Sequence, residues 1–163
     1  MAQFNRLQDY LAVAAKRLAD ARELLAPPSE EAPGDPRTRH LDAAVYLAGY
    51  VVECSLKAYL MSLAPDAKFF NEALEALAAA GKVSPEDSEF LAGHGHDLRR
   101  LLTASGLREK MTEVDQSRWG VVVKWKPEWR YDPRHMTSQA AAKRLVGTVE
   151  DVYWWIEDKR QRL

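Results

Sequence analysis

The sequence predicts an all-α fold in a single domain that spans residues 1–163. Three observations support this: apolar residues recur at helical intervals in three long segments, proline and glycine separate the segments, and only one stretch shows the two-residue period of an extended chain. With 163 residues, of which 47% are hydrophobic and 29% charged, the chain lies in the globular range. A chain of this size needs no metal or disulfide to fold.

The first two helices are expected to be long. Leucine and alanine residues between Leu7 and Leu25 follow the spacing of one helical face, and charged residues fill the remainder. This helix ends before Pro27-Pro28, where the segment PPSEEAPGDP can form neither a helix nor a central strand. A second helix is expected from about Thr38 to Leu63. It is apolar around most of its circumference, which is typical of a central helix packed by several neighbours.

Shorter helices are expected in the middle of the chain. The apolar pattern that starts at Phe69 predicts a helix ending at Gly81, a residue suited to the left-handed position after a helix end. Ser84-Pro85 predicts the start of the next helix, and another follows Gly93-His94-Gly95. The closing helix begins near Thr137-Ser138 and continues to the end of the chain.

The pattern changes between residues 117 and 132. Trp119, Val121, Val123 and Trp125 alternate with glycine, valine and lysine, which is the two-residue period of an extended segment. One isolated strand makes no sheet. We therefore expect an extended loop or small hairpin, rich in aromatic and basic residues, before the last helix.

Charge and hydropathy narrow the classes of partner. A net charge of -1 argues against a protein that coats nucleic acid with its whole surface. Residues 1–95 carry 9 basic and 14 acidic side chains, whereas residues 96–163 carry 14 basic and 10 acidic ones, so a polyanion is expected to bind the C-terminal third. The longest apolar run, residues 43–52, is too short to cross a bilayer, so no membrane partner is expected. The single cysteine, Cys54, cannot pair within the chain and predicts a cytoplasmic protein.

A narrow polar stripe runs along the second helix. Asp42, Tyr46, Gly49, Glu53 and Lys57 are spaced by three or four residues and therefore share one face. The stripe either faces water or forms a contact face. Gly49 favours a contact, because a glycine inside a helix costs ~1 kcal/mol relative to alanine and usually marks the close approach of another group. Glu53 and Lys57 are therefore candidate ligand-binding residues.

A second candidate site is the segment GHGHDL at residues 93–98. Two imidazoles and a carboxylate in a turn can in principle hold zinc or position a base. A closed zinc site needs three or four ligands, which this spacing does not supply, so neither a metal nor another cofactor is expected. For Asp97, capping the N-terminus of the following helix is a simpler explanation than binding zinc or positioning a base. His96 and Asp97 are kept as candidate ligand-binding residues.

Aromatic and basic residues interleave from Trp125 to His135. Such a segment can stack on bases and neutralise phosphates. The candidate ligand contacts in and beside it are Lys124, Lys126 and Tyr131. The alternative is that the aromatic side chains bury against the helices and anchor the loop, while the two lysines stay solvated.

The same segment contains a pair of residues suited to RNA cleavage. His135 can take a proton from a ribose 2′-OH, and the fixed guanidinium of Arg130 can stabilise the anionic phosphorane that develops. The sequence therefore makes Arg130 and His135 the candidate catalytic residues.

Three blocks of the sequence, taken in order, resemble the HEPN domain family of prokaryotes. They are AGYVVECSLKA at residues 48–58, GHDL at 95–98 followed by Leu101-Leu102, and WRY at 129–131. The resemblance covers nearly the whole chain. It implies an antiparallel up-and-down bundle of four or five helices, frequent homodimers, and nucleotide or RNA binding. Many members resemble metal-independent ribonucleases of toxin–antitoxin or defence systems, often partnered by a small nucleotidyltransferase antitoxin.

The resemblance also assigns roles to the candidate catalytic residues. The signature of the active members is an arginine, a polar residue and a histidine brought together across a dimer cleft, which places Arg130 as phosphate stabiliser and His135 as proton-transfer residue. Two functions follow from the sequence. One is a metal-independent endoribonuclease that uses these residues, and the other is a non-catalytic interaction module that binds a nucleotide or a partner protein.

Overall fold

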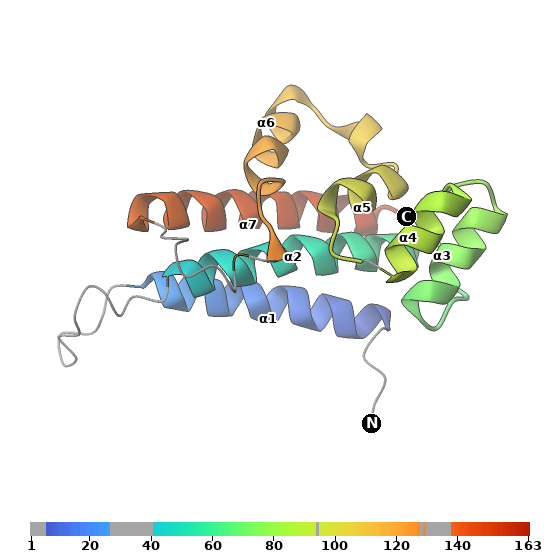
Figure 1. Ribbon diagram of the computed structural model, residues 1–163, viewed down its shortest axis with the longest axis horizontal. Coiled ribbons are helices and arrows are strands. Elements are labelled where there is room, and N and C mark those ends of the chain that lie inside the picture. Colours follow the sequence, from blue (N-terminus) through green and yellow to red (C-terminus); the bar gives the residue numbers. More distant parts are fainter. Residues whose placement is uncertain (1–5, 27–40, 94, 128, 130–137) are drawn as a thin grey trace.

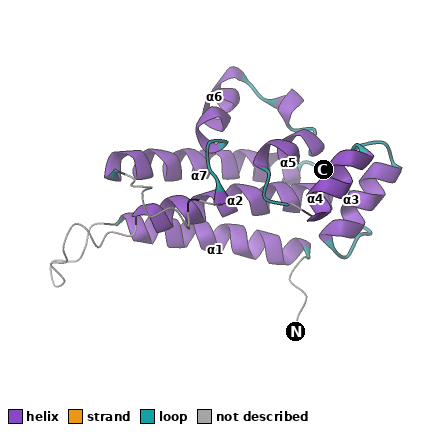
Figure 2. Cartoon of the chain, in the orientation of Figure 1, coloured by secondary structure: helices purple, strands orange, loops and turns teal. Residues whose placement is uncertain are grey.

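The fold is described from a computed structural model. The structure describes residues 6–26, 41–93, 95–127, 129 and 138–163. Within these residues the chain forms seven α-helices and short 3-10 segments, with no strand (Figures 1 and 2), so the predicted all-α class is confirmed. In this part of the chain, no helix combines the length and the apolar character that crossing a membrane requires.

Three long helices form the body of the molecule. They are α1 (Leu7–Leu25), α2 (Leu41–Ser62) and α7 (Gln139–Gln161), and α2 packs against both of the others (Figure 1). Fifteen of the 22 residues of α2 are buried, which confirms its predicted central position. Helix α1 ends just before Pro27, as the sequence predicts. The predicted loop after Pro27 and the expected start of α2 at Thr38 lie outside the described residues.

Shorter helices cover one end and one side of this body. Helices α3 (Phe70–Ala79) and α4 (Pro85–Gly93) pack against each other at the end of the molecule where α2 finishes (Figure 1). Helix α5 (Leu98–Ala104) packs against α2 and α4. The 3-10 helix η2 (Arg108–Lys110) leads to α6 (Glu113–Val122), which packs on α7.

The predicted helix ends are confirmed where local geometry decides them. Gly81 has a φ of +68°, the left-handed conformation that follows α3. The hydroxyl of Ser84 accepts the backbone N–H of Asp87 at 3.0 Å and so caps α4. The carboxylate of Asp97 caps α5, and Ser138 caps α7. These features depend only on neighbouring residues, and the sequence alone therefore identifies them.

The expected antiparallel bundle of four or five helices is not confirmed. Helices α1 and α2 are antiparallel, but α2 and α7 run in the same direction along the long axis (Figure 1). Helices α3 to α6 carry the chain back across the molecule before α7 begins. Three long helices with shorter ones on their ends and side therefore describe the fold better than an up-and-down order.

The extended segment predicted from residue 117 onward is wrong in its first part. Residues up to Val122 belong to α6. A capping box begins this helix, because the Thr112 hydroxyl accepts the backbone N–H of Asp115, and the Asp115 carboxylate accepts the backbone N–H of Thr112. Half-buried Trp119 and buried Val122 share one helical face with Asp115, so the apparent alternation is a coincidence of composition. Residues 128 and 130–132 lie outside the described residues.

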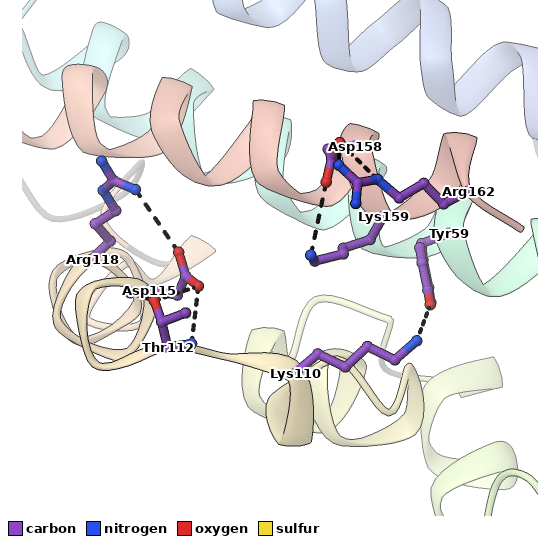
Figure 3. A network of polar contacts seen from close by, with 8 residues as sticks. All are labelled: Tyr59, Lys110, Thr112, Asp115, Arg118, Asp158, Lys159 and Arg162. Carbon is purple, nitrogen blue, oxygen red and sulfur yellow. Dashed lines mark hydrogen bonds and ion pairs between the residues drawn. The ribbon is translucent and has the colours of Figure 1, made fainter.

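Polar contacts attach η2 to α2 (Figure 3) and α6 to α7. Nζ of Lys110 donates to the hydroxyl of Tyr59, a buried residue of α2, at 3.3 Å. Arg118 lies 3.8 Å from the carboxylate of Asp115 and 3.2 Å from that of Asp151 on α7. The segment from η2 to α6 is therefore held from both α2 and α7.

The segment after α6 is anchored on Gly49. Trp125 is buried, and its indole Nε1 donates to the carbonyl of Tyr46 at 3.2 Å. A Cβ atom at Gly49 would lie 1.9 Å from Cε2 of Trp125, so the ring rests directly on the backbone of α2. The predicted close approach at Gly49 is confirmed, and the approaching group is a side chain of this chain.

Replacing Gly49 by alanine is expected to expel the Trp125 ring. We expect Gly49→Ala to lower the free energy of unfolding by about 1–3 kcal/mol, the usual cost of overpacking, in a urea titration. Gly147→Ala is the matched control, because a Cβ atom at this α7 position meets nothing within 4 Å. The control should gain up to ~1 kcal/mol. If both variants gained stability, Trp125 would not rest on Gly49.

Candidate functional site

The polar stripe of α2 contains a buried carboxylate. The Glu53 side chain is 4% exposed and that of Lys57, one turn later, is 10% exposed. Nζ of Lys57 donates to Oε1 of Glu53 at 2.7 Å, and Oε2 of Glu53 lies 2.8 Å from Nδ1 of His96. This part of the stripe is therefore a contact face rather than a solvated one. One carboxylate joins α2 to the turn that precedes α5.

Lys57 is enclosed on its other sides. Its Nζ lies 5.6 Å from the ring centre of Tyr10 and 5.5 Å from that of Phe70, both within cation–π range. A Cβ atom at Gly95 would lie 2.9 Å from the same Nζ, so the turn before His96 passes directly over the ammonium group. A glycine at position 95 allows this close approach.

The surroundings of the ion pair keep neighbouring groups uncharged. Burial, reinforced by the negative charge of Glu53 and only partly opposed by Lys57, raises the pKa of the Cys54 thiol to about 12. Burial is also the main reason that the pKa of the Tyr10 hydroxyl lies above its ordinary value. The Cys54 thiol is therefore protonated at neutral pH and is not a nucleophile.

A cavity of about 980 Å³ lies beside this cluster. His96 and Asp97 line it from the turn before α5, and Lys124 and Lys126 line it from the segment after α6. The other described lining residues are Phe90, Gly93, Leu98, Arg99, Val123, Trp125 and Pro127. Its volume is at the upper end of the ~300–1,000 Å³ of small-molecule sites. Four of the predicted ligand-binding residues, from two segments distant in sequence, therefore meet in one cavity, which we call the first cavity.

The first cavity has an excess of positive charge. Arg99, Lys124 and Lys126 are exposed, and none of them forms an ion pair with an acidic side chain that the structure describes. Asp97 is the one acid among the described lining residues, and Oδ1 of its carboxylate accepts the N–H groups of Arg99 and Arg100 at 2.9 and 3.0 Å. Three cations and one capping carboxylate favour an anionic ligand.

The two lysines owe their position to the tryptophan between them. Trp125 is fixed on Gly49, and the ring of Tyr50 contacts both Trp125 and His96, with centroids 5.3 and 6.0 Å apart. The tryptophan is thus buried against the helices while Lys124 and Lys126 stay exposed, as the alternative interpretation of this segment proposed. The same packing brings both lysines to the first cavity.

The remaining predicted residues are placed as follows. Glu53 and Lys57 do not line the first cavity, and Glu53 reaches it only through His96. Arg130, Tyr131 and His135 lie outside the described residues, as does His94. Within the part of the chain that the structure describes, no three histidine, cysteine, aspartate or glutamate side chains gather as a metal site would require.

Sequence reasoning missed Arg99 and Phe90. Arg100, the next residue, stacks its guanidinium 4.1 Å from the ring centre of Phe90 and pairs with Asp87 at 3.0 Å, so it attaches α5 to α4. Arg99 points from a different side of the same short helix and lines the first cavity instead. The predicted cap at Asp97 fixes where α5 starts, and the start of the helix determines the direction in which each arginine points. This cap is the one sequence signal that could have distinguished Arg99 from Arg100.

Comparisons with protein-family models, curated proteins and solved structures found no match to this chain.

Removing one partner of the buried ion pair is expected to be costly. We expect Lys57→Met to lower the free energy of unfolding by about 3–5 kcal/mol, because it leaves the buried carboxylate of Glu53 without its main counter-charge. The double variant Glu53→Gln/Lys57→Met should recover most of this loss, as measured by urea denaturation at neutral pH. Lys16→Met is the control, because Lys16 and Asp20 have the same spacing but Lys16 is 69% exposed. Its cost should stay below ~1 kcal/mol; similar losses for both lysines would contradict the prediction.

Proposed function

We propose that this protein is a HEPN-like protein that binds a nucleotide or RNA in the first cavity. The observation that supports the proposal most directly is the meeting of Lys124 and Lys126 with His96 and Arg99 around one cavity. Phosphate groups are the anions that such a set of cations binds in nucleic acids. In this proposal the protein acts as a homodimer, as the family resemblance implies.

The chemistry of the lining suggests how a nucleotide is held. Lys124 and Lys126 act as point charges towards phosphate oxygens, and Arg99 offers a planar fork that can bind two of them. Phe90 and Leu98 supply apolar surface for the base or sugar. His96 adds an imidazole whose orientation is set by the bond from Nδ1 to Glu53.

Removal of the two lysine side chains should weaken RNA binding selectively. We expect Lys124→Ala/Lys126→Ala to bind a labelled single-stranded oligoribonucleotide about tenfold or more weakly at low salt, measured by fluorescence anisotropy. The slope of log affinity against log salt should become shallower by about 0.7 for each phosphate that the variant no longer neutralises. The matched control is Lys82→Ala/Lys143→Ala, which removes the same charge from exposed positions outside the first cavity. Equal weakening by both double variants would mean that net charge alone governs binding.

The proposal extends to RNA cleavage by Arg130 and His135. The ribose 2′-oxygen attacks phosphorus, His135 takes the 2′-OH proton, and the bond from phosphorus to the 5′-oxygen breaks, with the leaving oxygen protonated by water. The products are a 2′,3′-cyclic phosphate and a 5′-OH end. Arg130 stabilises the charge of the phosphorane. RNA cleavage is supported by the sequence pattern and by the place of this segment in the sequence, shortly after Lys126 and Pro127, which line the first cavity.

Replacing the histidine should abolish cleavage without abolishing binding. We expect the purified protein to cleave single-stranded RNA in the presence of a chelator, and His135→Ala and Arg130→Ala each to lower the rate at least ~100-fold. Arg144→Ala, at an exposed position of α7, is the control and should cleave at the normal rate. Equal cleavage by the parent protein and His135→Ala, or none by either, would leave the non-catalytic interaction module as the function.

A further inference from the structure

A second cavity, of about 380 Å³, adjoins the first one. Arg99 lines both cavities, so its side chain marks the boundary between them. The second cavity extends from α5 to η2 and α6, where Arg108, Gln116 and Trp119 contribute to its wall. The two cavities are therefore neighbours, with Lys126 in the lining of the first, Trp119 in the lining of the second, and Arg99 in both.

The second cavity contains side chains of the kinds that can bind one nucleotide unit. Arg99 and Arg108 are exposed, neither forms an ion pair with a described acidic residue, and no acid is among the described lining residues. Trp119 is half-buried and so offers part of its indole as a surface on which a base can stack. Gln116 brings an amide that can donate to and accept from a base edge.

Two other cavities lined by described residues differ in charge. The cavity between α3 and α4, of about 470 Å³, is lined by Glu75 and Glu89 and by no cation. A smaller one of about 210 Å³ carries Asp66 and Lys82 together. Among these four cavities, the excess of cations is therefore confined to the two that share Arg99.

The wall of the second cavity is held in place before any ligand binds. Lys110, next to the cavity, bonds to Tyr59 of α2, and the capping box of Thr112 and Asp115 fixes the start of α6 (Figure 3). None of these four residues lines the cavity. Arg108 and Trp119 therefore lie on either side of a segment that other contacts already fix, which lowers the entropy cost of binding.

We propose that the second cavity is a subsite for the adjacent nucleotide, so that the preferred ligand is a single-stranded oligoribonucleotide rather than a mononucleotide. This inference rests on the proposed function of the first cavity. One phosphate lies at Lys124 and Lys126, the next lies at Arg99 between the cavities, and the following base stacks on Trp119 beside Arg108.

Two ligands of different length distinguish the contributions of the two cavities. Binding of adenosine 5′-monophosphate and of an oligoadenylate of about four nucleotides is measured by calorimetry for the parent protein and its variants. We expect Arg108→Ala and Trp119→Ala each to weaken oligoadenylate binding at least ~fivefold and to leave mononucleotide binding unchanged within about twofold. Lys124→Ala/Lys126→Ala should weaken both ligands.

Matched controls use the same residue types on α7. Arg144→Ala and Trp154→Ala change exposed residues away from both cavities, Trp154 being 57% exposed, and they should change neither affinity. Arg108→Lys keeps the charge but removes the planar fork, so it should retain part of the oligoadenylate affinity. This variant tests the subsite even if Trp119→Ala fails to fold.

Each outcome has a definite meaning. If both ligands bind but neither Arg108→Ala nor Trp119→Ala weakens the oligoadenylate, the subsite is overturned while the first cavity remains a binding site. Equal weakening of both ligands by Arg108→Ala also overturns it. If the parent protein binds neither ligand, the proposed function fails and the inference fails with it.

Discussion

The buried carboxylate of Glu53 is the interaction on which the rest of the structure depends. A charge in the middle of the most buried helix is tolerated only if it is paired and hydrogen-bonded. Lys57 pairs with it from the same helix and His96 from the turn before α5, at 2.7 and 2.8 Å. Helix α5 has only seven residues and cannot fix its own position through length. The contact to Glu53 holds the start of α5 on α2, and with it the wall of the first cavity that carries Asp97 and Arg99.

The opposite wall depends on a second contact one helical turn away. Gly49 admits the ring of Trp125, and the carbonyl of Tyr46 accepts its indole N–H. Glycine and glutamate on one face of α2 thus fix two segments that are otherwise irregular, and the first cavity lies between them. This arrangement explains the polar stripe on a helix whose other faces are apolar. Its buried residues contact different segments of the chain, Gly49 the segment after α6 and Glu53 the turn before α5. The glycine costs helix stability, and the packing of a tryptophan offsets this cost.

The sequence predicted the features that neighbouring residues determine. A glycine predicts where α3 ends, and serine or aspartate caps predict where α4, α5 and α7 begin. The close contact at Gly49 is predicted because a glycine lies inside a helix. The contacts between distant segments could not be predicted from the sequence, because His96 is 43 residues from Glu53 and Trp125 is 79 residues from Tyr46. Helix α6 was missed because alternating tryptophan and valine imitated a strand, whereas the Thr112 and Asp115 capping box that starts it was overlooked. Nothing local marks Arg108 as a lining residue, since an exposed arginine on a short helix has the same pattern whether or not a cavity lies beside it.

The same cluster that holds the fold also sets the electrostatics of the first cavity. The carboxylate behind His96 would repel a phosphate if its charge were left uncompensated. At an effective dielectric constant of about 20, unit charges about 8 Å apart, one on each side of an imidazole, repel each other by about 2 kcal/mol. Lys57 removes this repulsion from below, because its ammonium group lies against Glu53 and is covered by Tyr10 and Phe70 rather than by water. In the proposed function, the cations that line the first cavity then act on a phosphate without competition from the buried acid. In this proposal the ion pair serves stability and charge selectivity together, because the lysine that makes the burial of Glu53 tolerable also neutralises the carboxylate behind His96.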